Sequence, residues 1–193
     1  MRLTVHSFAL ILVLAAMGLT SATAETGSKV TAHQPIDLNS ITDTWFVIAH
    51  IPNLLERGHV ASKQIYTSAQ NGKMTVCYAY REGFLLPEKE ICAHAHFLKN
   101  SDNRDWYAWF YHVVPIHQPI LELEPNAGWL LLACPGHDLT WILARSPDMS
   151  RAQYQALVVK LRDEYGIYTD KLQRIAQYQN QENQLGFETP KVP

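Results

Sequence analysis

Residues 43 to 58 read DTWFVIAHIPNLLERG, and this stretch decides how the rest of the chain is interpreted. Its first part, up to Ile51, is an apolar segment with Trp45 near its start, as is typical of a β-strand. Pro52 then breaks the segment and opens a loop in which Leu54 and Leu55 stand side by side. The large aromatic residue and the apolar loop must each find a partner elsewhere in the chain.

Short apolar segments separated by turn residues continue along the chain. We expect eight strands, at residues 44–51, 60–68, 73–80, 90–98, 105–112, 118–124, 129–134 and 139–145. Asn71-Gly72 and Pro125-Asn126 are typical hairpin turns, and Pro115 separates the fifth expected strand from the sixth. These close connections predict an antiparallel meander.

One amphipathic helix is expected at about residues 148–165. Asp148 or Ser150 is its N-cap, and Gly166 stands at its C-terminal stop. A helix with a single apolar face packs against the outside of another layer. A further short segment, 167–176, follows the helix, and residues 179–193 form a polar tail that we expect to be extended.

Eight meandering strands and one helix predict an all-β fold. We expect an eight-stranded antiparallel up-and-down β-barrel with the C-terminal helix packed outside, since closure removes edge strands and leaves room for one small ligand. A β-sandwich is the alternative, although it usually needs longer crossing connections.

The first 24 residues have the features of a secretory signal peptide. A basic start is followed by the apolar run 8–19, and Ala22-Thr23-Ala24 fits a cleavage site. The run is shorter than the roughly 20 residues that a membrane-spanning helix needs. No cysteine precedes Cys77, so we expect no lipid anchor. Residues 25–36 form a polar lead-in to one domain.

The net charge limits the classes of partner, and the cysteine content limits the number of disulfides. The formal net charge of −2 argues against nucleic acid as an electrostatic partner. Three cysteines allow at most one internal disulfide, and Cys77 with Cys92 is the pair that a hairpin would bring together. The alternative is that all three cysteines are small buried residues.

The sequence then resembles the lipocalin family of the calycin group, most closely its bacterial branch. The motif TWFVIAHIPNLLERG (44–58) is similar to the family's opening strand and loop, and LTWILARSP (139–147) to its closing strand. NGKMTVCYAY (71–80), AHAHF (93–97) and YGIYTDKL (165–172) also match in order, so that the resemblance covers about residues 37–178. Asp43 stands where the family has glycine, and His50 where it has arginine.

The resemblance implies a role for two residues at the closed end of the barrel. Trp45 closes the floor, and Arg145 lies across its ring, with its donors on carbonyls of the segment 37–43. Both residues are expected to be structural and to make no contact with ligand.

Strand alternation extends the resemblance to a cavity lining. The expected lining and rim residues are Val47, Ala49, Ile51, Leu54, Leu55, Arg57, Val76, Tyr78, Ala95, Phe97, Trp106, Phe110, Leu121, Leu123 and Trp141. The facing of the strand with Trp106 and Tyr107 is left open. Such a lining suits a fatty acid, a lysophospholipid or a similar lipid, and a filled core without a cavity is the alternative.

The bacterial branch implies a periplasmic binding or transport protein for such lipids, with a role in membrane maintenance. Leu54 and Leu55 are candidates for a lid, or for a patch that contacts a membrane or a second subunit in a homodimer. Glu56 and Arg57 suit a polar head group or, more commonly, an exposed ion pair. We expect no cofactor, no metal and no enzyme activity, since no local catalytic motif occurs. The alternative is a metal- or haem-binding sensor or enzyme that uses histidines such as His94 and His96.

Overall fold

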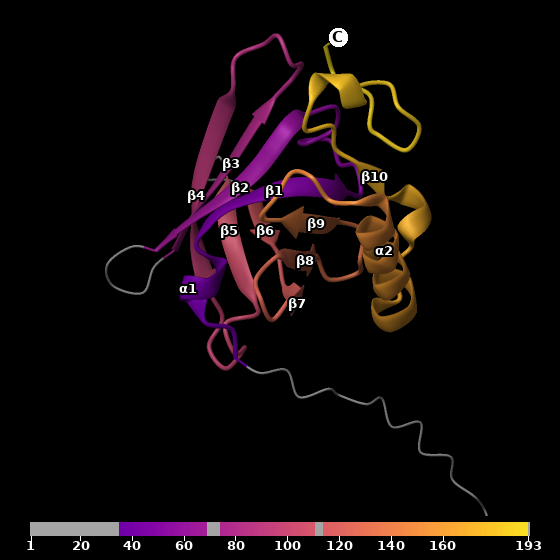
Figure 1. The fold of residues 1–193 in the computed structure, drawn as a ribbon. Helices are drawn as coiled ribbons and strands as arrows, with labels where there is room; N and C mark the ends of the chain where they lie inside the picture. The colour runs from indigo at the N-terminus through magenta and orange to yellow at the C-terminus, as the bar shows by residue number, and fades with distance from the viewer. Residues whose placement is uncertain (1–34, 69–73, 111–113, 193) are drawn as a thin grey trace, which may run out of the picture. The chain divides into compact units, whose positions relative to one another are not determined.

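A computed structural model describes residues 35–68, 74–110 and 114–192 of the chain. The described residues belong to one compact unit (Figure 1). The expected signal peptide, most of the lead-in and the Asn71-Gly72 turn lie outside the described residues. Within the described ranges, no helix has both the length and the apolar character needed to cross a membrane.

Strands occupy most of this unit, and one long helix follows them. The elements are α1 (Leu38–Ile41), β1 (Asp43–His50), β2 (Val60–Ser68), β3 (Met74–Arg81), β4 (Lys89–Phe97), β5 (Trp106–Phe110), β6 (Val114–His117), β7 (Ile120–Leu123), β8 (Trp129–Ala133), β9 (Thr140–Ala144), α2 (Arg151–Tyr165), η1 (Thr169–Lys171), β10 (Gln173–Arg174) and η2 (Gln179–Gln181).

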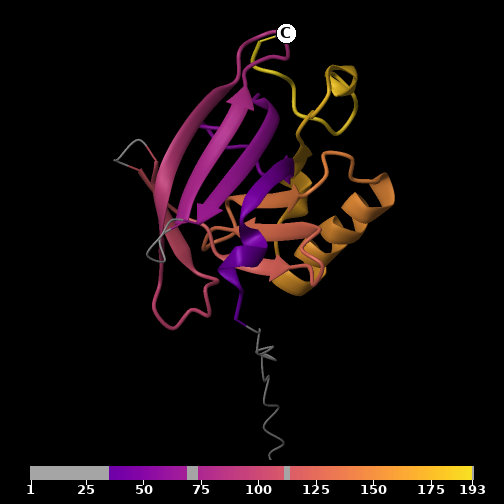
Figure 2. The same ribbon diagram turned by 60° about the vertical axis from the view of Figure 1, so that its left-hand side comes forward.

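The strands form one antiparallel sheet in the order β6-β5-β4-β3-β2-β1-β9-β8-β7, and β10 pairs with β1. The two ends of this path, β6 and β7, are consecutive in the chain and are joined by Gln118 and Pro119. Gln118 N donates to Trp106 O at the start of β5, while Ala133 N of β8 donates to Pro119 O. The Gln118-Pro119 connection is therefore hydrogen-bonded to β5 on one side and to β8 on the other. The sheet curls round on itself, as the sequence predicts (Figure 2).

The sixth strand differs from the expectation, because it is divided into β6 and β7 and begins earlier than residue 118. Pro115, which was expected to separate strands, lies inside β6 and pairs with Trp109. β6 has a hydrogen-bonded strand on one side only, namely β5. Proline lacks the N–H that a second neighbour would need, so it is tolerated at such a position.

Two apolar clusters fill the space on either side of the sheet. The inner cluster gathers side chains from the concave face, including Val47, Val76, Ala95 and Trp106. The helix-side cluster joins β1, β8 and β9 to Leu157 and Leu161 of α2, and Figure 1 shows α2 beside these strands. The expected C-terminal helix, α2, therefore packs outside, as predicted.

Both ends of α2 match its sequence signals. Ser150 is the N-cap, with its hydroxyl accepting from Gln153 N at 3.2 Å. Gly166 ends the helix in a left-handed conformation with φ of +66°. The N-terminus of the helix therefore lies at the later of the two expected cap residues.

Trp45 and Arg145 meet as the resemblance implies. The Arg145 Cζ atom lies 3.8 Å from the centroid of the buried Trp45 ring. The guanidinium also donates to Ser40 O at 2.8 Å and to Thr44 O at 3.1 Å. Trp45 Nε1 donates to Ile41 O at 2.8 Å. The Trp45 ring therefore contacts both α1 and Arg145, the residue that directly follows β9.

Asp43 begins β1 with φ of +83°, in the left-handed region that favours glycine. Its carboxylate Oδ1 accepts from Thr44 N at 2.7 Å. Aspartate tolerates this conformation better than most residues because its short side chain can bond locally. The turn expected of a glycine is thus made by an aspartate.

Candidate functional site

The β1–β2 loop folds into a tight turn that directs some of its side chains toward solvent and others toward the interior. Asn53 Oδ1 accepts from Leu55 N at 2.9 Å and from Glu56 N at 3.1 Å. Asn53 O accepts from Arg57 N at 2.9 Å. As a result Leu54 and Leu55 point outward and are 92% and 52% exposed, whereas Glu56 turns inward.

Glu56 is the centre of a polar network. Its Oε2 atom accepts from three donors, which are Asn53 Nδ2 at 2.9 Å, Trp141 Nε1 at 2.9 Å and His50 Nδ1 at 3.1 Å. Burial works against ionisation of this carboxyl, but the bonds and the charge of His50 prevail and lower its pKa. The exposed Glu56–Arg57 pair expected from the sequence is therefore wrong, because these contacts hold Glu56 away from solvent.

His50 lies between two carboxylates at the end of β1. Its second nitrogen, Nε2, lies 2.6 Å from Glu188 Oε2, and both residues are buried. Burial alone would lower the pKa of His50, yet the hydrogen bonds to Glu188 and Glu56, with their charges, raise it to about 9. One imidazolium thus faces two carboxylates, and the cluster has one more negative than positive charge.

The C-terminal segment supplies Glu188 by packing back onto two loops, so the tail is not extended as expected. Lys191 N donates to Gly58 O, and Val192 N donates to Glu82 O, both at 2.8 Å. A Cβ atom at Gly58 would lie 2.8 Å from Lys191 N, and Gly58 has φ of +74°. Because Gly58 has no side chain, the backbone of the C-terminal segment can approach it closely enough to form the hydrogen bond from Lys191 N. Figure 2 shows this segment reaching the loop between β3 and β4.

Beside Glu56 lies a small recess, the inner pocket, with a volume of about 30 Å³. Its lining residues are Leu55, Glu56, His59, Gln64, Tyr78, Tyr80, Ile91, Phe110, Ile116 and Gln118. The His59 ring stacks on Tyr80 with centroids 3.7 Å apart, and its Nδ1 lies 3.1 Å from the Tyr78 hydroxyl. Burial lowers the pKa of His59 to about 4, so the ring is neutral near pH 7.

A larger, partly open cleft, the outer pocket, adjoins the inner one and has a volume of about 480 Å³. It lies between the β1–β2 loop, β6 and the β8–β9 turn. Its lining residues are Asn53, Leu54, Leu55, Glu56, Pro115, Ile116, His117, Cys134, Leu139 and Trp141. The two pockets share Leu55, Glu56 and Ile116. This volume falls within the range of small-molecule sites.

The structure brings a part of the expected lining to these pockets. Leu54, Leu55, Tyr78, Phe110 and Trp141 line one or the other. Val47, Val76, Ala95 and Trp106 lie in the inner cluster, and Phe97 and Leu123 pack against it. Arg57 is exposed and faces a separate groove beside Glu188. Trp106 is buried while Tyr107 is not, which settles the facing of β5.

Three of the expected lining residues face the wrong side. Ala49 and Ile51 lie in the helix-side cluster, and Leu121 packs against it. The register shifts between Val47 and Ala49, and again between Ile120 and Glu122. Each irregularity interrupts the alternation of side chains, so the residues beyond it exchange faces.

Sequence reasoning missed most of the polar residues of the pockets, namely Glu56 as an inward-facing acid, His59, Gln64 and Gln118, and it also missed Glu188, which bonds to His50. His50 was noted where the family has arginine, and this departure was the signal for an altered network. Glu188 carries no local signal, because its partner lies 138 residues away.

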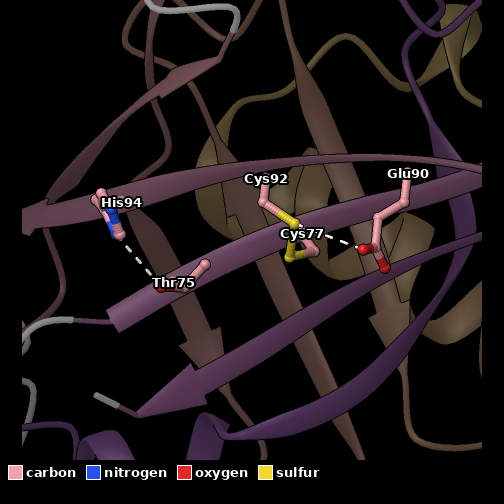
Figure 3. Close-up of a disulfide and its surroundings, with 5 residues drawn as sticks. All are labelled: Thr75, Cys77, Glu90, Cys92 and His94. Carbon is pink, nitrogen blue, oxygen red and sulfur yellow. Dashed lines mark hydrogen bonds between the residues drawn. A yellow bond between two sulfur atoms is a disulfide. The ribbon is translucent and has the colours of Figure 1, made fainter. Parts of the chain in front are cut away.

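The expected disulfide forms between Cys77 of β3 and Cys92 of β4, with an S–S length of 2.03 Å. Figure 3 shows it on one face of these strands, with Glu90 and His94 on either side of it. Glu90, Cys77 and Cys92 form the one group of three metal-type ligands among the described residues, but its sulfurs are bonded to each other. Burial raises the pKa of the remaining thiol, Cys134, to about 11.

His94 and His96 are exposed on the outer face of β4. His94 Nδ1 lies 3.3 Å from Thr75 Oγ1, across the strand pair (Figure 3). No described contact favours a metal or haem role for either histidine.

The comparisons with known proteins agree with this architecture. A family model described as a lipocalin-like domain matches residues 36–177. No curated protein matches the sequence. Insecticyanin of the tobacco hornworm Manduca sexta is similar in structure, with a TM-score of 0.61 and 12% identity over 83% of this chain and 92% of that one.

Two further solved structures show the same fold. Lobster apocrustacyanin A1 has a TM-score of 0.58 at 12% identity, covering 74% of this chain and 80% of that one. The siderocalin Ex-FABP has a TM-score of 0.51 at 11% identity, covering 71% and 94%. At such identities the likeness concerns the fold alone.

Proposed function

Because the chain belongs to the lipocalin family, we propose that it binds small hydrophobic molecules with an alkyl or acyl chain in the outer pocket. The observation that carries this proposal is the cavity of about 480 Å³, where Leu55, Ile116 and Trp141 supply apolar surface. Removing a chain from water into such a site is favourable by about 25 cal/mol per Å². Fatty acids and lysophospholipids share such a chain and are the lipid classes to test first.

The proposed role is binding and transport rather than catalysis. Glu56 Oε2, the carboxylate oxygen at the junction of the pockets, already accepts three hydrogen bonds. A carboxylate oxygen held by three hydrogen bonds is better suited to a fixed structural role in the pocket than to transferring a proton. The siderocalin Ex-FABP is described as functioning through dual ligand specificities, and a binding role fits that precedent.

Export to the periplasm belongs to the same proposal and rests on the signal-like residues 1–24 and the resemblance to the bacterial branch. Leu54, at 92% exposed, is the residue we propose for transient contact with a membrane or with a second subunit. Such contact would place the outer pocket near a source of lipid.

One experiment tests the binding site directly. Ile116 lines both pockets and is half-buried, so Ile116→Glu should remain folded and weaken binding of a fluorescent alkyl-chain probe at least tenfold. Val159→Glu, on the exposed side of α2, is the matched control and should bind as the parent does. Equal affinity in a folded Ile116→Glu protein would refute the site. Mass spectrometry of lipid extracted from the purified protein identifies the natural ligand class.

A further inference from the structure

The inner pocket has more polar side chains in its lining than the outer pocket, among them Glu56, His59 and Gln118, although apolar side chains line it as well. Its volume of about 30 Å³ holds one or two atoms beyond hydrogen. The apolar outer pocket beside it is far larger. The two pockets together therefore offer a small recess that contains several polar groups and a large, mainly apolar space.

Gln118 gives the first indication of what the polar end receives. Its side chain is only 2% exposed and lines the inner pocket. Its Oε1 atom is buried and has no hydrogen-bond partner among the described residues. An unpaired buried acceptor costs about 1–3 kcal/mol, so a ligand that donates a hydrogen bond here removes that cost.

Glu56 offers a second acceptor at the same place. The three donors described above all bond to Oε2, and the carboxylate has a second acceptor oxygen, Oε1. Tyr78 donates its hydroxyl hydrogen to Ser62 Oγ at 3.2 Å, which leaves the Tyr78 oxygen to accept from His59 Nδ1–H. The other nitrogen of the neutral His59 ring is then an acceptor as well.

The charge around these acceptors is the next consideration. Among the described residues that line either pocket, none is lysine or arginine. The nearby cluster of His50, Glu56 and Glu188 has an excess of negative charge. A ligand carboxylate would meet this excess of negative charge and would find no lysine or arginine among the described lining residues.

We propose, resting on the binding function above, that the ligand places a small hydrogen-bond-donating head group without negative charge, an amine or an alcohol, in the inner pocket and its chain in the outer pocket. Gln118 Oε1 and Glu56 Oε1 receive the head group. Among amphiphiles with the same chain, the protein thus selects amines and alcohols over free acids.

Calorimetric titration with decylamine, decanol and decanoate tests this preference, since the three probes share a ten-carbon chain. At pH 7 we expect decylamine to bind at least tenfold more tightly than decanoate, with decanol between them. Gln118→Leu, similar in volume, should weaken decylamine and decanol about 5- to 30-fold and leave decanoate within twofold. Gln118→Glu, which presents acceptors only, should strengthen decylamine.

Gln155→Leu is the matched control, because Gln155 is exposed on α2. It should leave all three affinities unchanged. If decanoate binds as tightly as decylamine, the head-group inference is overturned while the binding function stands. If none of the three probes binds the folded protein, the proposed function itself fails. Circular dichroism confirms that each variant is folded.

Discussion

His50 Nε2 and Glu188 Oε2 lie 2.6 Å apart, although the two residues are separated by 138 positions in the chain. The contact joins the end of β1 to the C-terminal segment at the edge of the loop that carries Glu56. It fixes one side of the pocket region through a buried ionic hydrogen bond. The tail is consequently a part of the folded unit.

Loss of this contact should weaken folding measurably. Glu188→Gln keeps the size of the side chain but removes the charge that faces His50. Because hydrogen bonds to charged groups contribute about 1.5–3 kcal/mol, we expect the free energy of unfolding to fall by about 2 kcal/mol in urea titrations. Glu182→Gln, in the same tail and without a side-chain bond in the structure, should change it by less than about 0.5 kcal/mol. Equal effects of the two substitutions would contradict the ionic role of Glu188.

Stability should also depend on pH through His50. Its pKa is raised from 6.5 to about 9 in the folded protein, so folding favours the protonated ring. This contribution is complete below about pH 6.5 and is lost as the pH rises through 9, with a magnitude on the order of 3 kcal/mol. The pKa of Glu56 is lowered instead, so its contribution is lost as the pH falls below 4.5.

Urea midpoints measured between pH 5 and pH 10 check this profile. The parent protein should lose stability steadily between about pH 6.5 and pH 9. His50→Gln should be less stable at pH 6 and nearly flat across that interval. A decline of the same size in His50→Gln would show that other groups cause it.

The backbone at Asp43 gives a prediction that separates conformation from side-chain bonding. Asp43→Gly and Asp43→Ala both remove the bond to Thr44 N, but only glycine adopts φ of +83° without strain. Asp43→Gly should therefore be more stable than Asp43→Ala by about 1–2 kcal/mol. At Asp138, an exposed turn residue without positive φ, alanine should be at least as stable as glycine. Thermal unfolding of the four variants decides the question.

The disulfide should contribute to stability and not to binding. Cys77 and Cys92 are 15 residues apart, and a loop of that length corresponds to about 3 kcal/mol in the chain-entropy model. The paired Cys77→Ser, Cys92→Ser variant should lose roughly that amount in urea. Neither cysteine lines the inner or the outer pocket, so the affinity for decylamine should stay within twofold. A tenfold loss of affinity in the folded variant would contradict this separation.

The sequence was sufficient for the features that depend on local pattern. Trp45, Arg145 and the caps of α2 lie where their motifs place them. The divided strand could not be predicted, because whether Pro115 ends a strand depends on how many neighbours that strand has. This number is known only from the assembled sheet.

The candidate site was predicted less well, for a related reason. One residue left out of the ladder reverses the facing of the residues beyond it, and Ala49 and Leu121 show the result. Glu56, Gln118 and Glu188 acquire their roles from partners on other strands or in the tail. Their surroundings arise only in the folded chain, where burial and neighbouring charges act together.

The long separation between His50 and Glu188 also has a consequence in time. A ribosome that adds about 5–20 residues per second delivers Glu188 roughly 7 to 28 seconds after His50. Of the two carboxylate partners that His50 has in the folded protein, only Glu56 has been synthesised during that interval. The residues that line the two pockets end at Trp141, so all of them are synthesised before the tail residue that bonds to His50.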